Sequence, residues 1–374
     1  MKKRNMSRIT ALLLAVAMLL SLAACGGSGS QPDSGSSSGS GGAGSGASGG
    51  SAAPADAIEW SLGTTDSDPE TSSMNSFADF TRAFCDLVNE RAEGRLVITP
   101  YYNSVLGGDV QLLNDVRDGN LEICHINPMS GIDPRFGFKA LPYLFEDFEQ
   151  VRELMANPDG ELFQIIKDIC AEQNTYCLSV GEGIMRGFLN SKHPVRTVAD
   201  LKDLTCRVYE DPCVSAFWSP ICNASILSWS ECYTSLQTGT VDGMESAATI
   251  SCSSKFYEVT DYYTDIDWQW VGEFLILNQD CWDELDPDLQ EIVQQAAWEA
   301  AEVESEKAAE YREQAYAMLE DNGVEVTLLS EAEKAEWVKY GRSCYEPIRE
   351  IVGAETYDRV IGILEESNSA RNAG

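Results

Sequence analysis

IEWSLGTTDSDPETSSMNSFADFTRAFCDLVNERAEGRLVIT, residues 58–99, is the stretch that decides the fold. The apolar run 58–62 predicts a strand, and a polar loop follows it. A helix is predicted next from apolar residues at helical spacing, which are Phe77, Phe80, Phe84, Leu87 and Val88. Gly94 marks the end of this helix, and 96–99 reads as a second strand. A strand, a helix and a strand with short connections predict an α/β unit with largely parallel pairing.

The same alternation continues along the chain. Further strands are predicted over 121–126, 176–180, 186–189, 205–209 and 324–328, and helices over 110–117, 149–155, 162–172 and 197–200. A long helix is predicted from Pro287 to Asn322, since proline suits the first helical position. After Ala55 about 320 residues remain, which is more than one core of about 250–300 residues usually holds. We therefore expect two lobes.

The N-terminus predicts an exported lipoprotein. Four basic residues within the first eight precede the apolar run 9–22, which is shorter than the roughly 20 residues that a spanning helix needs. Leu22-Ala23-Ala24-Cys25 looks like a lipobox, so we expect residues 1–24 to be a signal peptide and Cys25 to carry lipid. Residues 25–56 are rich in Gly and Ser and predict a flexible tether.

The charge of the chain excludes one class of partner. Its formal net charge is -34, and removing the four bases of the leader leaves about -38 (-34 minus 4). Such a surface repels nucleic acid and anionic lipid headgroups, so we expect no nucleic-acid partner. The net charge does not decide the sign of a small ligand, because salt screens exposed charges beyond about 8 Å.

Cysteine and histidine usage argues against catalysis. Of the twelve cysteines, eleven remain after Cys25, and none of them forms a C-x-x-C pair. We expect buried free thiols, with one or two disulfides left open. The two histidines, His125 and His193, lie in no nucleophile motif, which excludes a His-based hydrolase and a His-rich metal site. Both are expected to be structural, although His125 adjoins a candidate binding loop.

Residues 231–245, ECYTSLQTGTVDGME, predict a helical turn, a glycine C-cap and a tight turn at Gly243 with positive φ. This segment closely resembles a signature of the substrate-binding proteins of TRAP (tripartite ATP-independent periplasmic) transporters, the DctP family. Further pieces of that family follow in its order between Ile58 and about Gly353. They are LGGDVQLLNDVRDGNLEI, ALPYLFEDFEQVRE, GIMRGFLNSKHPVRTVADLKDLTCRV, KFYEVTDYY and the run from Leu277 to Trp282.

The resemblance implies a two-lobed periplasmic-binding-protein-like α/β fold, in which crossing strands and a long helix join lobes that close like a hinge. Residues 57–182 and 272–312 would form lobe I, and residues 183–271 and 313–374 lobe II. It also implies a binding protein with no enzymatic activity, so we expect no catalytic residue, no cofactor and no metal.

By the same resemblance, Arg207 forms a bidentate salt bridge with a ligand carboxylate and Arg186 assists it. The planar guanidinium suits that role. Internal ion pairs remain open for both, Arg207 with Glu210 or Asp211 and Arg186 with Glu182. The other expected ligand-binding residues are Asp68, Thr71, Asn127, Met129, Asn223, Trp229, Glu245 and Ser246. Aromatic residues of the segment 268–274 are either cleft wall or core, and these are Trp268, Trp270 and Phe274.

The expected ligand is a small organic anion, a mono- or dicarboxylate. Residues 244–246 read Met-Glu-Ser where members that bind sugar acids often have Gln-Glu-Asn, so the ligand's identity stays open. The expected partners are the small and large membrane subunits of a TRAP transporter. We expect a monomer on the outer face of the cytoplasmic membrane (cell surface or periplasm), held there only by its N-terminal lipid. Two alternatives are a binding protein that feeds a sensor kinase and an extracellular enzyme.

Overall fold

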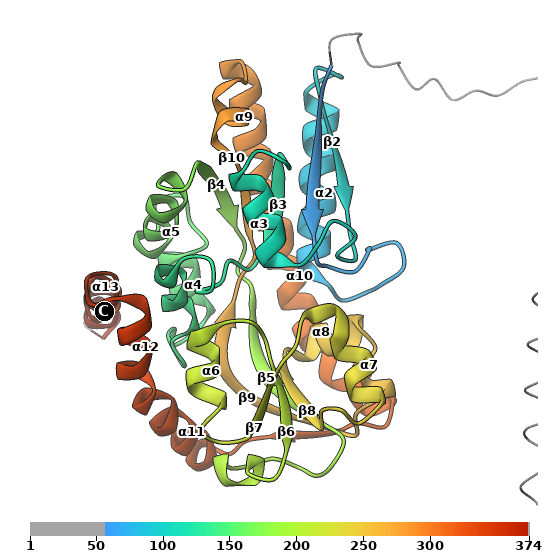
Figure 1. The fold of residues 1–374 in the computed structure, drawn as a ribbon, viewed down its shortest axis with the longest axis vertical. Helices are drawn as coiled ribbons and strands as arrows, with labels where there is room; N and C mark the ends of the chain where they lie inside the picture. Colours follow the sequence, from blue (N-terminus) through green and yellow to red (C-terminus); the bar gives the residue numbers. More distant parts are fainter. Residues whose placement is uncertain (1–56, 373–374) are drawn as a thin grey trace, which may run out of the picture. The chain divides into compact units, whose positions relative to one another are not determined.

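The computed structural model describes residues 57–372, which hold two β-sheets flanked by helices (Figure 1). The predicted signal peptide, Cys25 and the tether lie outside these residues. The first sheet has the order β2-β1-β3-β10-β4. Its strands are β2 (Leu96–Tyr101), β1 (Ile58–Thr64), β3 (Ile123–Ile126), β10 (Phe274–Asn278) and β4 (Thr175–Val180).

The second sheet has the order β11-β9-β5-β8-β6-β7. Its strands are β11 (Glu325–Leu328), β9 (Tyr262–Val271), β5 (Ile184–Asn190), β8 (Gly243–Ser246), β6 (Thr205–Val208) and β7 (Asn223–Ile226). Two sheets with helices around them confirm the predicted two-lobed α/β fold. The strands β7, β8, β9 and β10 lie where the sequence analysis predicted no strand.

The first predicted unit has the expected pairing. β1 and β2 are parallel, with Ile58 opposite Leu96, and helix α2 (Ser76–Arg91) connects them. Asn75 caps α2, because its side chain accepts a hydrogen bond from the backbone N–H of Ala78. The predicted apolar face of α2 packs against the first sheet and the long helix α10 (Pro287–Asp321).

The chain changes sheets at two adjacent crossings. β4 continues into β5 through Gly181–Gly183, and β9 continues into β10 through Gly272 and Glu273. β5 and β9 pair antiparallel, with Ile184 opposite Val271, so the two crossings lie side by side. Gly183 has φ +72°, and a Cβ there would overlap the carbonyl oxygen of Val271. These crossings are therefore narrow and leave no room for larger residues.

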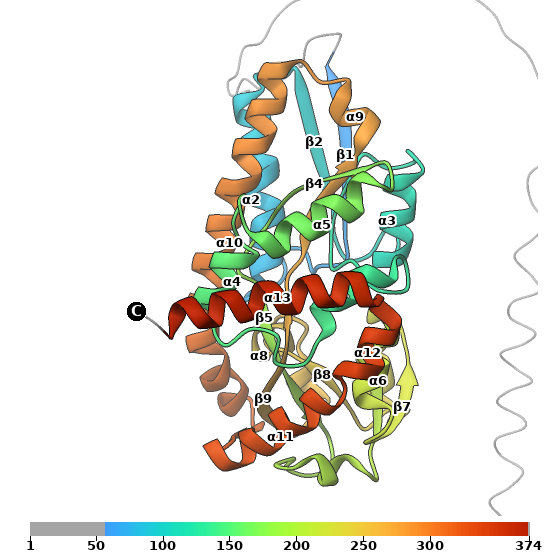
Figure 2. The same ribbon diagram turned by 90° about the vertical axis from the view of Figure 1, so that its left-hand side faces the viewer.

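Helix α10 confirms the predicted long helix and contacts both halves of the described chain. It packs on α2 and β4 near the first sheet and on α8 and β11 near the second (Figure 2). The last helix, α13 (Ala354–Arg371), lies within the stretch predicted for lobe II. It nevertheless packs against α5 beside the first sheet, where Arg359 Nη1 lies 3.0 Å from Asp168 Oδ2.

The remaining helices are short and cover the sheets. They are α3 (Asp109–Arg117), η1 (Pro134–Ala140), α4 (Phe148–Leu154), α5 (Glu161–Ala171), η2 (Val198–Leu201), α6 (Pro212–Trp218), η3 (Trp229–Glu231), α7 (Cys232–Gln237), α8 (Ala248–Ser253), η4 (Phe256–Glu258), α9 (Gln279–Asp283), α11 (Glu331–Ser343) and α12 (Tyr345–Val352). None of the helices within residues 57–372 is long and apolar enough to cross a membrane.

Burial and backbone geometry settle three predictions made from the sequence. The eleven cysteines of the described chain are free and mostly buried, as predicted for thiols acting as small apolar groups. The three aromatics Trp268, Trp270 and Phe274 belong to the core, where each is at most 1% exposed. The prediction of a positive-φ turn at Gly243 was wrong. Gly243 starts β8, and its missing side chain is explained by Leu189 O, which would lie 2.5 Å from a Cβ.

Candidate functional site

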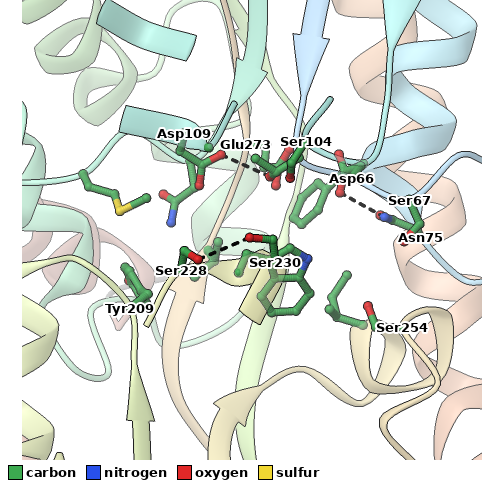
Figure 3. Close-up of a pocket in the computed structure, with 18 of the residues that line it drawn as sticks. Asp66, Ser67, Asn75, Ser104, Asp109, Tyr209, Ser228, Ser230, Ser254 and Glu273 are labelled. Carbon is green, nitrogen blue, oxygen red and sulfur yellow. Dashed lines mark hydrogen bonds between the residues drawn. The ribbon is translucent and has the colours of Figure 1, made fainter. Parts of the chain in front are cut away.

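A pocket of about 330 Å³ is lined from both sheets (Figure 3). One wall comes from the carboxyl ends of β1 and β3 and from the start of α3. The facing wall comes from β5, β6 and the loop after β7. Such an arrangement is common in α/β proteins, because loops at the carboxyl ends of parallel strands converge there.

Two buried arginines share one buried glutamate beside this pocket. Arg186 is on β5, Arg207 is on β6, and Glu245 is on β8, the strand between them. Glu245 Oε1 lies 3.3 Å from Arg207 Nη1, and Glu245 Oε2 pairs with Arg186 Nη1. Arg186 is 9% exposed, Arg207 is 3% exposed and Glu245 is 0% exposed. The internal ion-pair partner of both arginines is therefore Glu245.

None of the three partners proposed from the sequence pairs with these arginines, and Glu210 is exposed and forms no ion pair within residues 57–372. Glu182 pairs with Arg152 and Arg312, and Asp211 accepts hydrogen bonds from Ser130. Strand pairing explains the difference, because β8 enters the sheet between β5 and β6 from a distant part of the sequence.

Arg207 keeps hydrogen-bonding capacity for a ligand. Its Nε donates to Leu227 O at 3.0 Å and its Nη1 to Glu245, which uses two of the five N–H donors of a guanidinium. Nη2 forms no hydrogen bond within residues 57–372, and the residue lines the pocket. The guanidinium lies 5.7 Å from the ring centroids of Tyr209 and Trp229, which restrict it by cation–π contacts.

The opposite wall carries three acidic side chains that the sequence did not single out. Asp66 follows β1, Asp109 begins α3 and Glu273 lies between β9 and β10 (Figure 3). Burial raises the pKa of Asp66, raises that of Asp109 to about 7 and raises that of Glu273 well above its usual range. Asp109 accepts a hydrogen bond of 3.1 Å from Thr65. The pocket is thus basic on one side and acidic on the other.

Five of the ten predicted ligand-binding residues line the pocket. They are Asn127, Met129, Arg186, Arg207 and Trp229. Whether they contact a ligand stays a prediction.

The other five lie outside the lining. Glu245 and Ser246 are fully buried behind the arginines, while Thr71 and Asn223 are exposed and Asp68 is half-buried. Asn223 begins β7 opposite Thr205, at the end of the strands away from Tyr209 and Ser228. The residues that replace Asp68 and Thr71 are Thr65, Asp66 and Ser67, which come directly after β1.

Residues 69–350 match the model of the DctP family, described as bacterial extracellular solute-binding protein, family 7. A solute-binding protein of Chromohalobacter salexigens is 32% identical over 59% of this chain and 65% of its own length, just under two thirds. The 2,3-diketo-L-gulonate-binding periplasmic protein YiaO of Escherichia coli is 28% identical over 69% of this chain and 78% of its own.

Solved structures show the same fold. A periplasmic solute-binding protein of Chromohalobacter salexigens with bound D-glucuronate has a TM-score of 0.75 and 26% identity, covering 82% of this chain and 99% of that one. The sugar acid binding protein DctPAm of Advenella mimigardefordensis, in complex with galactonate, has a TM-score of 0.76 and 23% identity, covering 83% and 99%.

Proposed function

This chain belongs to bacterial extracellular solute-binding protein family 7, the DctP family, and we propose that it captures a small organic acid for a TRAP transporter. The names of its relatives support this ligand class, since YiaO is named for a sugar acid and a Bacillus subtilis relative is named C4-dicarboxylate-binding protein DctB. No feature of the described residues favours signalling to a sensor kinase instead.

The observation that carries the proposal is the buried Arg186–Glu245–Arg207 group beside the pocket. One glutamate cannot neutralise two guanidinium groups, so the group keeps one net positive charge in a desolvated place. A ligand carboxylate would neutralise that charge and accept the free N–H donors of Arg207. The expected contact is therefore between the carboxylate and Arg207, with Glu245 holding both arginines in place.

Binding would be coupled to closure of two lobes. The proposed lobes are residues 57–182 with 272–312 and residues 183–271 with 313–374, with α13 lying across to α5. A ligand bridging the basic and acidic walls favours the closed state by its differential affinity for that state. The crossings at Gly181–Gly183 and at Gly272 are the expected hinge positions.

The proposed setting is the outer face of the cytoplasmic membrane. Lipid on Cys25 would tether the protein there, and the small and large TRAP membrane subunits would receive the ligand from a monomer. We propose binding without catalysis. If chromatography detected a product formed from any bound acid, that result would contradict binding without catalysis.

A thermal-shift screen against a library of carboxylates tests the proposed function. The wild type is expected to gain stability with at least one acid. Arg207→Ala is expected to lose about 2–5 kcal/mol of binding free energy, since it removes a buried charged hydrogen-bonding partner of the ligand. At micromolar wild-type affinity, which is about -8 kcal/mol, this loss weakens binding at least about 30-fold, so the thermal shift at a fixed acid concentration becomes clearly smaller.

Arg359→Ala is the matched control. Arg359 pairs with Asp168 on the surface, away from the pocket, so this variant should respond to the acid as the wild type does. Undiminished affinity in Arg207→Ala would contradict the proposed role of Arg207. A library in which no acid stabilises the wild type would contradict the ligand class.

A further inference from the structure

A cluster of three side chains at the acidic wall has no role in the proposed carboxylate contact. Asp66, His125 and Glu273 each offer a ligand atom, and these atoms lie within 4.8 Å of one another. The residues are 7%, 0% and 8% exposed. Asp66 and Glu273 also line the pocket, whereas His125 lies behind them on β3. The cluster therefore connects the core of the first sheet with the binding cavity.

Two atoms of this cluster are buried without a hydrogen-bond partner. Among the described residues, neither Glu273 Oε2 nor His125 Nε2 has one. Glu273 Oε2 points into the cluster, because it lies 3.8 Å from His125 Nδ1. An unsatisfied buried polar atom costs about 1–3 kcal/mol. Such atoms are explained when they bind a group that the protein chain itself does not supply.

The neighbouring residues hold these side chains in position. Asp66 accepts hydrogen bonds from Thr64 Oγ1 at 3.0 Å and from Asn75 Nδ2 at 2.9 Å. His125 Nδ1 shares a hydrogen bond of 2.9 Å with Thr81, which leaves Nε2 as the nitrogen able to ligate, and the ring stacks on Phe80 with centroids 4.2 Å apart. Metal-binding carboxylates and imidazoles are usually held in this way by outer partners.

The carboxyl groups of the cluster have no cationic side chain as a partner. No lysine or arginine of residues 57–372 forms an ion pair with Asp66 or Glu273. His125 is fully buried, and an imidazole nitrogen is a common metal ligand. A positive ion between the two carboxyl groups would take the place of their protons and occupy the unpaired oxygen.

We propose that Asp66, His125 and Glu273 bind one divalent transition-metal ion at the acidic end of the pocket. Two carboxylates with one imidazole suit Mn²⁺ or a similar ion. Ligand atoms around one ion lie about 3–4 Å apart, given metal–ligand distances near 2.1 Å, so the cluster needs to contract by about 2 Å at most. Three protein ligands leave coordination positions open.

Those open positions would face the pocket, because Asp66 and Glu273 line it. A hydroxyl or carboxylate oxygen at the far end of the bound acid then completes the coordination. This second part rests on the proposed function, whereas binding of the ion alone does not.

Titration of the purified, untagged protein with Mn²⁺ alone tests the site. The signal of free Mn²⁺ in electron paramagnetic resonance reports the bound fraction, and about 0.15 M salt screens the acidic surface. Mn²⁺ is chosen because it prefers oxygen and nitrogen to the many free thiols. We expect one ion per chain, with a hyperfine coupling to an imidazole nitrogen.

Variants identify the ligands. His125→Gln and Glu273→Gln should each weaken this binding at least 10-fold, while His193→Gln, which changes the chain's other histidine, should leave it unchanged. If His125→Gln does not fold, the Mn²⁺ affinity of Glu273→Gln and the nitrogen coupling in the wild type still test the site. Equal affinity in wild type and both variants, no nitrogen coupling, or no saturable binding would each overturn the site. Thermal stabilisation by an acid with no Mn²⁺ present would leave the proposed function intact, so the two can fail separately.

Discussion

At the residue scale, Glu245 determines how the two arginines are presented. It is fully buried, and it bonds Arg186 and Arg207 at once. Glu245→Gln would leave two guanidinium groups without their buried counter-charge. We expect the free energy of unfolding, measured by urea denaturation, to fall by about 3–5 kcal/mol. A bound carboxylate should restore part of this loss, so the acid should stabilise the variant more than the wild type.

Glu299→Gln provides the comparison for that prediction. Glu299 forms a bidentate pair with Arg91 but is half exposed, so its loss should cost less than about 1 kcal/mol. A Glu245→Gln protein as stable as this control would show that Glu245 does not compensate the arginines.

The sequence predicted this site only in part. Arg186 and Arg207 were identified from the resemblance to the DctP family, and a planar guanidinium suits a carboxylate. Glu245 was expected to contact the ligand. Its ion pairs with both arginines were not predicted, because they depend on pairing between segments 59 and 38 residues apart. Asp66, Asp109 and Glu273 have no motif, and only the fold brings them together.

At the element scale, the crossings between the sheets depend on glycine. Gly183 and Gly239 have φ values of +72° and +70°, but a Cβ at 183 would overlap Val271 whereas a Cβ at 239 would meet nothing within 4 Å. Both alanine variants incur the cost of positive φ. Gly183→Ala should therefore lower the free energy of unfolding by about 1–3 kcal/mol more than Gly239→Ala, from overpacking.

Chemical denaturation of both variants measures this difference. Equal losses would mean that the crossing relaxes to accept a methyl group, and would argue against a tight crossing. Among the elements, the parallel pair β1–β2 and the helix α10 were predictable from local periodicity. The strands β7, β8, β9 and β10 were not predicted, because their places in the sheets depend on pairing with segments that lie apart in the sequence.

At the scale of the whole molecule, a buried acid on the long helix links stability to pH. Glu304 on α10 accepts hydrogen bonds from Ser76 and from Gly183 N, and burial raises its pKa to about 7. The folded protein thus holds a proton that the unfolded chain releases above about pH 4.5. The free energy of unfolding should fall by roughly 3 kcal/mol from this group as pH rises from about 4.5 to 7.

In Glu304→Gln this contribution is absent, so the free energy of unfolding should fall by roughly 3 kcal/mol less over the same pH range. Urea denaturation at several pH values measures this difference. Glu302→Gln, on the exposed side of the same helix, should follow the wild-type curve. Parallel pH curves for wild type and Glu304→Gln would show that Glu304 titrates normally in the folded state.

The central claim is that the pocket between the two sheets holds a carboxylate on Arg207. A crystal structure with the most stabilising acid from the screen tests it most directly. We expect a carboxylate oxygen within about 3 Å of the Arg207 guanidinium, with Glu245 still bridging both arginines. An acid bound elsewhere, or bound in the pocket with its carboxylate away from Arg207, would contradict the account.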